Sequence, residues 1–256
     1  MQTGGKIFRG DVRLNVNLPN GNQTGFLPAQ NASAFQIVVP EPEVTERISK
    51  MRDTAGQVLD AVSEVQPHQL NITFDGFNGT LLATAFNGAL ASYSTAAVPT
   101  GSAQILARIG AGVSVGHYNI GTVVVKDDNE GAPGTTTFTL GEDYEIESRL
   151  GLIVALPDGL ITEGELLHVT YVAAASDGDV IRGAAVSEIT ASIIFDGIDK
   201  VSGQSMIGEF DRVVLSGSGN FDFLADEFNA VEIVGRVITL EGATEPHRLR
   251  FPSAAA

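Results

Sequence analysis

Residues Thr137–Val172 read TFTLGEDYEIESRLGLIVALPDGLITEGELLHVTYV and alternate short extended segments with turn residues. Asp143–Glu147 leads into Leu150–Leu156, and the pair Asp158-Gly159 then turns the chain. Three apolar residues of the last segment share one face of a strand: Leu167, Val169 and Tyr171. Side chains that alternate with a period of two, punctuated by Asp-Gly and Glu-Gly, are typical of strands joined by hairpins. The stretch therefore predicts a β-meander in a mainly β chain.

The composition agrees with a β protein that has a real core. The chain has 256 residues, enough for one large β domain or two smaller ones, and 43% of them are hydrophobic. Aromatic residues make up only 7%, there is no Trp, and 29 residues are Gly. Because there is no Cys, disulfides, thiolate catalysis and Cys-based metal sites are excluded.

The charge is strongly acidic. Thirty-one acidic residues against 15 basic ones give a net charge of −16, with no basic run. Proteins that grip DNA neutralise phosphates with Lys and Arg, so this balance argues against DNA binding. An acidic wall would suit a conduit that lets DNA pass, although acidic surfaces also simply keep proteins soluble. The sequence has no apolar run of 18 residues and no signal-peptide core in MQTGGKIFRGD, so we expect no membrane insertion and a cytoplasmic start.

Residues 43–65 predict a long hairpin. Helix is the competing interpretation, because Glu, Arg, Lys and Met favour it. A hairpin turning at Asp53, Thr54, Ala55 and Gly56 would pair residues whose numbers sum to 109. Its apolar face would then hold Val44, Ile48, Leu59, Ala61 and Val65. Its wetted face would hold Thr45, Arg47, Ser49, Asp60 and Glu64.

The chain around this hairpin reads as one discontinuous domain, 1–96 and 177–256, with a β module inserted at 97–176. Residues 1–34 predict a flexible arm with one strand at Val12–Leu18 and a turn at 19–21, and residues 241–256 a mobile tail. The remaining expectations follow in chain order: strands at 35–39 and 70–74, a helix at 80–86, a linker at 89–103, strands at 105–109, 113–115, 122–126 and 136–140, a closing linker at 173–178, strands at 187–195 and 209–215, a turn at 216–219, a helical turn at 221–228 and a strand at 230–240.

No motif carries chemistry. Gly112–Gly116 spells G-x-S-x-G, but its Ser lies in Val-Ser-Val with no helix to follow, which favours a strand edge. Residues 127–131 lack the spacing of a calcium loop and predict a solvated hairpin loop. The four His residues are scattered singly, without a second ligand at metal spacing. We therefore expect no catalytic site, no metal and no cofactor.

Several segments together resemble the major tail tube proteins of long-tailed, siphovirus-type bacteriophages. They are GEDYEIE, GLIVAL and ITEGELLHVTY of the meander, the hairpin at 43–66, and residues 68–88, 193–204 and 212–237. The resemblance implies an antiparallel β-sandwich or barrel flanked by one short α-helix, with a protruding hairpin. It also implies hexameric rings stacked into a tube in the virion tail, assembled in the host cytoplasm, through which genomic DNA passes without sequence-specific binding. Its implied partners are further copies of the chain and the tape measure, tail terminator and distal tail proteins.

The same resemblance gives roles to the hairpin. Its wetted face would look into the lumen, while the turn at 53–56 or the arm at 1–34 would reach a neighbouring ring. About two dozen strands spaced ~4.8 Å apart and tilted ~45° close a barrel roughly 50 Å across, which leaves room for DNA. The inserted module would lie outside the tube. The alternative from another class is a surface or secreted β-sandwich that binds or adheres, and an enzyme ranks third.

Overall fold

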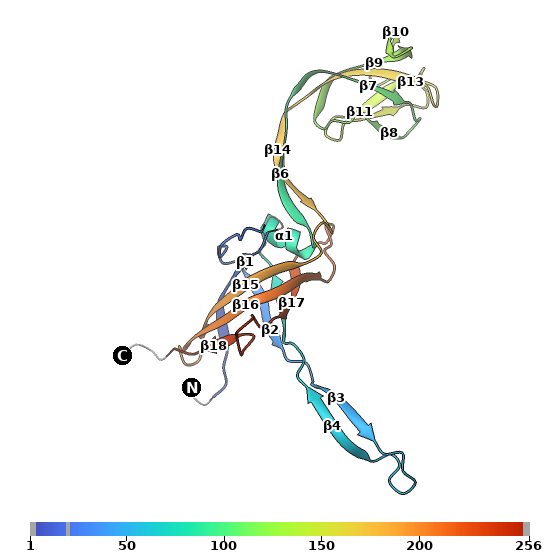
Figure 1. Cartoon of the computed structure of the whole chain (residues 1–256). Helices are drawn as coiled ribbons and strands as arrows, with labels where there is room; N and C mark the ends of the chain where they lie inside the picture. Colours follow the sequence, from blue (N-terminus) through green and yellow to red (C-terminus); the bar gives the residue numbers. More distant parts are fainter. Residues whose placement is uncertain (1–3, 19–20, 253–256) are drawn as a thin grey trace. The chain divides into compact units, whose positions relative to one another are not determined.

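The computed structural model describes residues 4–18 and 21–252, and it is mainly β, with 54% of the chain in strands and 3% in helix. The chain divides into two compact units, one formed by residues 1–91 with 180–256 and the other by residues 92–179. Figure 1 shows the strands of each unit. Sequence expectations of an antiparallel β fold with one short helix are confirmed, since all named strand pairs are antiparallel.

Unit 1 is built on a seven-stranded sheet. Its strands lie in the order β1-β15-β16-β17-β5-β2, and β18 pairs with the first part of β16. Their bounds are β1 Phe8–Val16, β2 Ala32–Val38, β5 Gln69–Phe74, β15 Ile189–Asp199, β16 Ser205–Ser218, β17 Val231–Val237 and β18 Arg248–Arg250. The sheet curls on itself, because Phe35 of β2 stacks on Phe195 of β15 with ring centroids 5.0 Å apart.

Alternate residues of these strands form the core of unit 1, and α1 (Gly79–Ala85) covers it. Asn78 caps the helix by accepting a hydrogen bond from the Leu81 N–H at 3.0 Å, and Leu81 is fully buried. Gly217 of β16 lets the helix approach, because a Cβ there would lie 1.7 Å from the Ala85 carbonyl oxygen. The helix predicted at 80–86 is thus confirmed within one residue at each end.

Between β2 and β5 the chain forms a separate two-stranded sheet of β3 (Glu43–Ile48) and β4 (Val58–Glu64). The predicted hairpin is therefore confirmed and the helical alternative is wrong. Its residues are exposed throughout both strands.

Unit 2 has its own core, which includes Val125, Leu167 and Val169. One sheet has the order β10-β9-β13-β7 and the other β11-β12-β8. Bounds are β7 Val98–Leu106, β8 Gly112–Ser114, β9 Ile120–Asn129, β10 Ala132–Thr137, β11 Tyr144–Glu147, β12 Leu152–Ala155 and β13 Leu166–Ala173. The chain enters along β6 (Ala89–Thr95) and leaves along β14 (Ser176–Arg182), which pair with each other.

The meander prediction is only partly correct. Strands β11 and β12 pair as a hairpin, and Leu167, Val169 and Tyr171 share a buried face. Strand β13, however, pairs with β7 and β9 and not with β12. The linkers predicted at 89–103 and 173–178 are wrong, since β6, β7 and β14 run through them. The small residues of these segments do not alternate between apolar and polar side chains, so the sequence does not indicate the strands.

The N-terminal arm is also a wrong prediction. Strand β1 pairs along its whole length with β15 and buries Val12 and Leu14. Ahead of it, the Ile7 N–H donates to Asp199, and the Lys6 ammonium lies 3.0 Å from the same buried carboxylate. Hydrogen bonds from the Ser202 hydroxyl, and then from backbone N–H groups, hold the pKa of Asp199 well below its usual range. Of the turn predicted at 19–21, Pro19 and Asn20 lie outside the described residues.

Three predictions near the C-terminus fail as well. Residues 216–218 continue β16 instead of turning, and 221–228 form no helical turn. The tail at 241–256 contains β18, whose pairing with β16 holds it to the sheet, while residues 253–256 lie outside the described part.

Among the described residues, no helix is long and apolar enough to cross a bilayer.

Candidate assembly surface

The hairpin β3–β4 extends the ladder of β2 and β5. Val38 pairs with Gln69 and Glu43 with Glu64, so in both places the residue numbers add to 107. The pairing lapses between them, where the chain reads Val39-Pro-Glu-Pro on one side and Val65-Gln-Pro-His on the other. Because proline has no N–H to donate, it interrupts a ladder. Continuing the register across the gap sets Pro40 opposite Pro67, and Pro42 follows, so three prolines separate the hairpin from the sheet.

The hairpin exposes a large amount of apolar surface. Among the described residues, its strands pack against no other strand, and all 13 of their residues are exposed. The apolar side chains are 46–61% exposed: Val44, Ile48, Val58, Leu59 and Val62. Exposed apolar side chains gathered in one place mark an interaction site more often than a free surface.

The two faces of the hairpin differ in polarity. The Arg47 Nε and Asp60 Oδ2 atoms lie 2.8 Å apart on one face, which also carries Thr45 and Glu64 and, opposite Thr45, the apolar Val62. The other face carries most of the apolar residues, together with Glu46 and Ser63. Glu43 lies opposite Glu64, and like charges directly across a ladder are destabilising. The Gln66 amide offsets part of that repulsion by donating to Glu43 at 3.0 Å.

The predicted wetted face is thus mostly retained, with two corrections. The pairing sum is 107 and not 109 from Glu43 to Arg47, but a shift of two residues leaves the side chains of that part of the ladder on their faces. Ser49 does not belong to that face, because it is only 2% exposed. A register shift between Arg47 and Ile48 leaves Leu59 as an extra residue in β4.

Ser49 instead closes the hairpin loop. Its N–H donates to the Gln57 carbonyl at 2.8 Å, and its hydroxyl lies 2.6 Å from that of Thr54. Gly56, with φ of +88°, donates its N–H back to the Ser49 carbonyl. The four residues predicted as the turn lie inside this longer loop: Asp53, Thr54, Ala55 and Gly56.

A pair of histidines lies at the base of the hairpin. The rings of His68 and His247 are 5.1 Å apart, and His247 stacks on Phe210 at 5.3 Å. Burial, and then the neighbouring His68, lowers the pKa of His247. Sequence reasoning missed this pair, because residues so far apart in the chain give no local signal. The pair connects the C-terminal strand β18 to the first residues of β5.

The arrangement can form contacts with further strands. A two-stranded hairpin leaves the outer N–H and C=O groups of both strands free, so each edge can accept another strand. Isolated hairpins are at best marginally stable in water, and added strands supply the missing burial. In the described part of the chain, no three His, Cys, Asp or Glu side chains come together in a way that could hold a metal.

A model of the family described as "Protein of unknown function UCP028589" matches residues 6–243, which include the hairpin and both units. No curated protein matches the chain.

Proposed function

This chain belongs to the family described as "Protein of unknown function UCP028589", and from its exposed hairpin we propose that it is a structural protein that assembles with its own copies into a tube. The tube is the tail tube of a long-tailed phage, built of stacked rings and assembled in the host cytoplasm. It conducts genomic DNA and performs no reaction.

The observation that carries the proposal is the unsupported hairpin. Its apolar side chains, its two open edges and its separation from the sheet by prolines all favour strand pairing with neighbouring copies. In a closed barrel every edge is paired, so the hairpins of several copies would satisfy one another. The polar face with Thr45, Arg47, Asp60 and Glu64 then lines the lumen.

Charge supports the conduit. The chain carries −16, and the ion pair with Asp60 neutralises Arg47 on the lumen face. Phosphates passing such a wall find no unpaired cation on it and are not held.

The strand count constrains the ring. Two strands from each of six copies make twelve, which at ~4.8 Å spacing and ~45° tilt close a barrel about 26 Å across. Side chains reduce that opening to about 16 Å, less than a DNA duplex of ~20 Å needs. A six-membered conduit therefore draws two further strands per copy from the sheet of unit 1. Tape measure, tail terminator and distal tail proteins would bind the lumen and the two ends of the tube.

Electron microscopy of the full chain at rising concentration tests the proposal. Wild-type protein should form hollow rings or tubes. Val58→Pro, which places a proline at the first residue of β4, opposite Ile48 in the ladder, should abolish them and leave a folded monomer. Val65→Pro is the matched control, because Val65 lies outside the ladder, where the strands already part.

Two results would count against the tube. Normal tubes from Val58→Pro would mean that another segment makes the contacts. A wild-type chain that stays monomeric at every concentration and also with tail extracts would favour the surface-binding alternative, which a glycan and ligand screen would then examine.

A further inference from the structure

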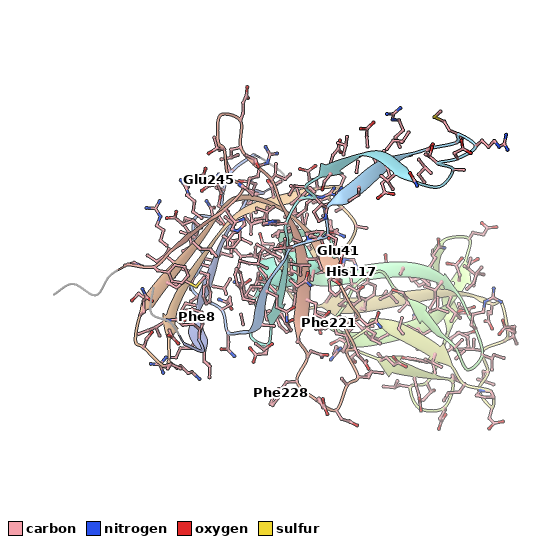
Figure 2. The ribbon with its side chains drawn as sticks, turned by 90° about the horizontal axis from the view of Figure 1, so that it is seen from below. Phe8, Glu41, His117, Phe221, Phe228 and Glu245 are labelled. Atoms are coloured by element: carbon pink, nitrogen blue, oxygen red, sulfur yellow. The ribbon has the colours of Figure 1, made fainter. Side chains whose placement is uncertain are left out.

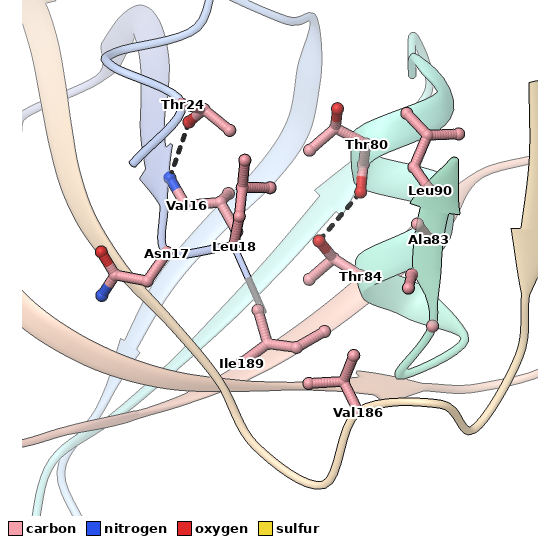
Figure 3. A pocket seen from close by; sticks show the side chains of 12 residues that line it. Val16, Asn17, Leu18, Thr24, Thr80, Ala83, Thr84, Leu90, Val186 and Ile189 are labelled. Carbon is pink, nitrogen blue, oxygen red and sulfur yellow. Dashed lines mark hydrogen bonds between the residues drawn. The ribbon is translucent and has the colours of Figure 1, made fainter. Parts of the chain in front are cut away.

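A small apolar pocket lies beside α1 in unit 1, away from the hairpin. It has a volume of about 240 Å³, and six apolar residues line much of it: Val16, Leu18, Ala83, Leu90, Val186 and Ile189. Figure 3 shows these side chains around an open centre, with Thr80 and Thr84 on the helix side. A cavity of about 150 Å³ is enough to admit a benzene ring. The pocket therefore has room for one aromatic side chain.

The same unit presents an aromatic loop with nothing to cover it. In the segment between β16 and β17, Leu224 is 91% exposed and Phe228 is completely exposed. Phe223 is also exposed, but it packs against Phe221 with ring centroids 4.7 Å apart. Figure 2 shows Phe228 on a loop that projects beyond Phe221. Such exposure of a phenylalanine is unfavourable unless a partner covers it.

The loop does not fill the pocket of its own copy, because Phe228 is completely exposed. Phe221, at the start of the loop, packs edge-on against Phe77 and Phe86, with centroids 5.6 and 5.9 Å away. Thr80, Ala83 and Thr84 of α1 line the pocket, and the start of the loop packs on Phe86, directly after the helix. The pocket is therefore open to an occupant from another molecule.

The loop and the surroundings of the pocket carry unpaired charges of opposite sign. Asp226 and Glu227 directly precede Phe228, and neither forms an ion pair within the described residues. Beside the pocket, the Arg182 backbone packs against Gly88, and the Arg182 side chain is exposed and makes no ion pair in the described part of the chain. The acidic residues of the loop and Arg182 beside the pocket would attract each other as the copies dock.

We propose that Phe228 of one copy inserts into the apolar pocket beside α1 of a second copy, with Glu227 facing Arg182 at the rim. The contact joins two different surfaces, so it repeats head to tail and generates a ring if the rotation closes or a filament if it does not. It joins the bodies of neighbouring copies and is separate from pairing of their hairpins. The inference therefore goes beyond the proposed tube and can fail or hold independently of it.

The first test removes the anchor. Sedimentation velocity of the full chain measures self-association of wild type, Phe228→Ala and Phe223→Ala. A buried aromatic anchor typically contributes enough that its loss weakens association at least about thirtyfold. Phe223→Ala, the matched control in the same loop, should change it less than about threefold. Equal effects of the two variants, or none from Phe228→Ala, would overturn the proposal.

The second test uses exposed residues that are not needed for folding. Arg182→Glu and Glu227→Arg should each weaken association about twofold to fivefold, the range for an exposed charge pair. An equimolar mixture of the two single variants should recover it, because every loop then finds a pocket of opposite charge. The double variant Arg182→Glu/Glu227→Arg should recover it as well. Failure of both the mixture and the double variant to recover would show that the two residues do not meet.

The two proposals give distinguishable failures. Phe228→Ala that still forms normal tubes would remove the loop contact and leave the hairpin tube standing. Val58→Pro that loses tubes but keeps charge-swap recovery in sedimentation would support the loop contact on its own.

Discussion

The strand pairs β2–β5 and β3–β4 are two lengths of one antiparallel ladder, but the apolar side chains of β5 are buried and those of β3–β4 are exposed. Both keep the pairing sum of 107 over most of their length, and both carry branched apolar residues on one face: Leu70 and Ile72 in β5, and Val44 and Ile48 in β3. In β5 these residues are buried, with Ile72 at 1% and Phe74 at 0% exposure. In β3, Ile48 is 52% exposed. The local pattern is alike, so the difference comes from what covers each length.

The two strand pairs differ in the elements that cover their edges and faces. β5 lies between β2 and β17, and the curled sheet covers its apolar face. Neither edge nor face of β3–β4 is covered by another strand in the described chain. Apolar side chains that gather on one face of a strand and yet stay exposed in the folded chain thus indicate a face that another molecule covers.

The largest expected effect separates the two lengths in the free monomer. Ile72→Ala should lower the free energy of unfolding by about 2–5 kcal/mol, because it leaves a cavity in a packed core. Ile48→Ala, the matched substitution in β3, should lower it by less than about 1 kcal/mol. Urea denaturation at a dilution where the chain is monomeric measures both. A loss from Ile48→Ala as large as that from Ile72→Ala would mean that the hairpin is already packed in the monomer.

Ile48→Ala, which has the smaller effect on unfolding, should have the larger effect on the association of copies. Ile48→Ala should weaken assembly about tenfold, since truncating a buried interface residue typically costs more than 1 kcal/mol. The critical concentration for tube formation, from light scattering, gives the value. Thr45→Ala on the wetted face serves as control and should shift it less than about twofold. Equal shifts would remove the distinction between the two faces.

A third prediction concerns how stability depends on pH at the base of the hairpin, where the rings of His68 and His247 lie close together. The pKa of folded His247 is lowered, so the unfolded chain binds more protons between that pKa and the ordinary value of about 6.5. Stability is therefore greatest above pH 6.5, falls as the pH drops through that value and levels off below the folded pKa. Protonation also sets the charge of His247 close to the ring of His68.

Hydrogen exchange of the β18 amides between pH 7.5 and 5, corrected for intrinsic rates, follows this loss. His247→Phe retains a ring to stack on Phe210 and should remove the pH dependence. His117→Phe, changed in the other unit, should retain it. Unchanged dependence in His247→Phe would assign the titration to another group.

Sequence reasoning found the elements whose signals are local. Helix α1 lies between Asn-Gly pairs that mark both ends, and β5 alternates Leu70, Ile72 and Phe74 with polar residues. The hairpin was found for the same reason. Its register was wrong by two residues because the Ser49–Gln57 bond closes a loop longer than four residues, and no residue pattern announces that closure.

Sequence reasoning failed where the signal is tertiary. Strand β1 lies among Gly, Asn and Gln and resembles a free arm until its pairing with β15 is known. Ser49 was assigned to a wetted face by alternation, but its hydrogen bonds bury it. The histidine pair and the pocket beside α1 join segments far apart in the chain. Of the candidate site, the sequence could predict the faces of the hairpin and not the contacts that fix its loop and base.

The smallest expected effect tests whether the hairpin is optimised for the free chain. Glu43 and Glu64 face each other across the ladder, and like charges opposed in this way cost a few tenths of a kcal/mol to about 1 kcal/mol. Glu64→Lys should replace this repulsion with an opposite-charge pair and slow hydrogen exchange in β3 and β4 about twofold to fivefold. Gln69→Lys, in β5 opposite Val38, adds positive charge, half the change made by Glu64→Lys, without a carboxylate across the ladder and should leave the hairpin amides unchanged. Slower exchange in both variants would point to net charge as the cause. Slower exchange in Glu64→Lys alone would show that the carboxylate pair weakens the hairpin while it stands free, which is expected of a segment whose stable form is the one completed by neighbouring strands.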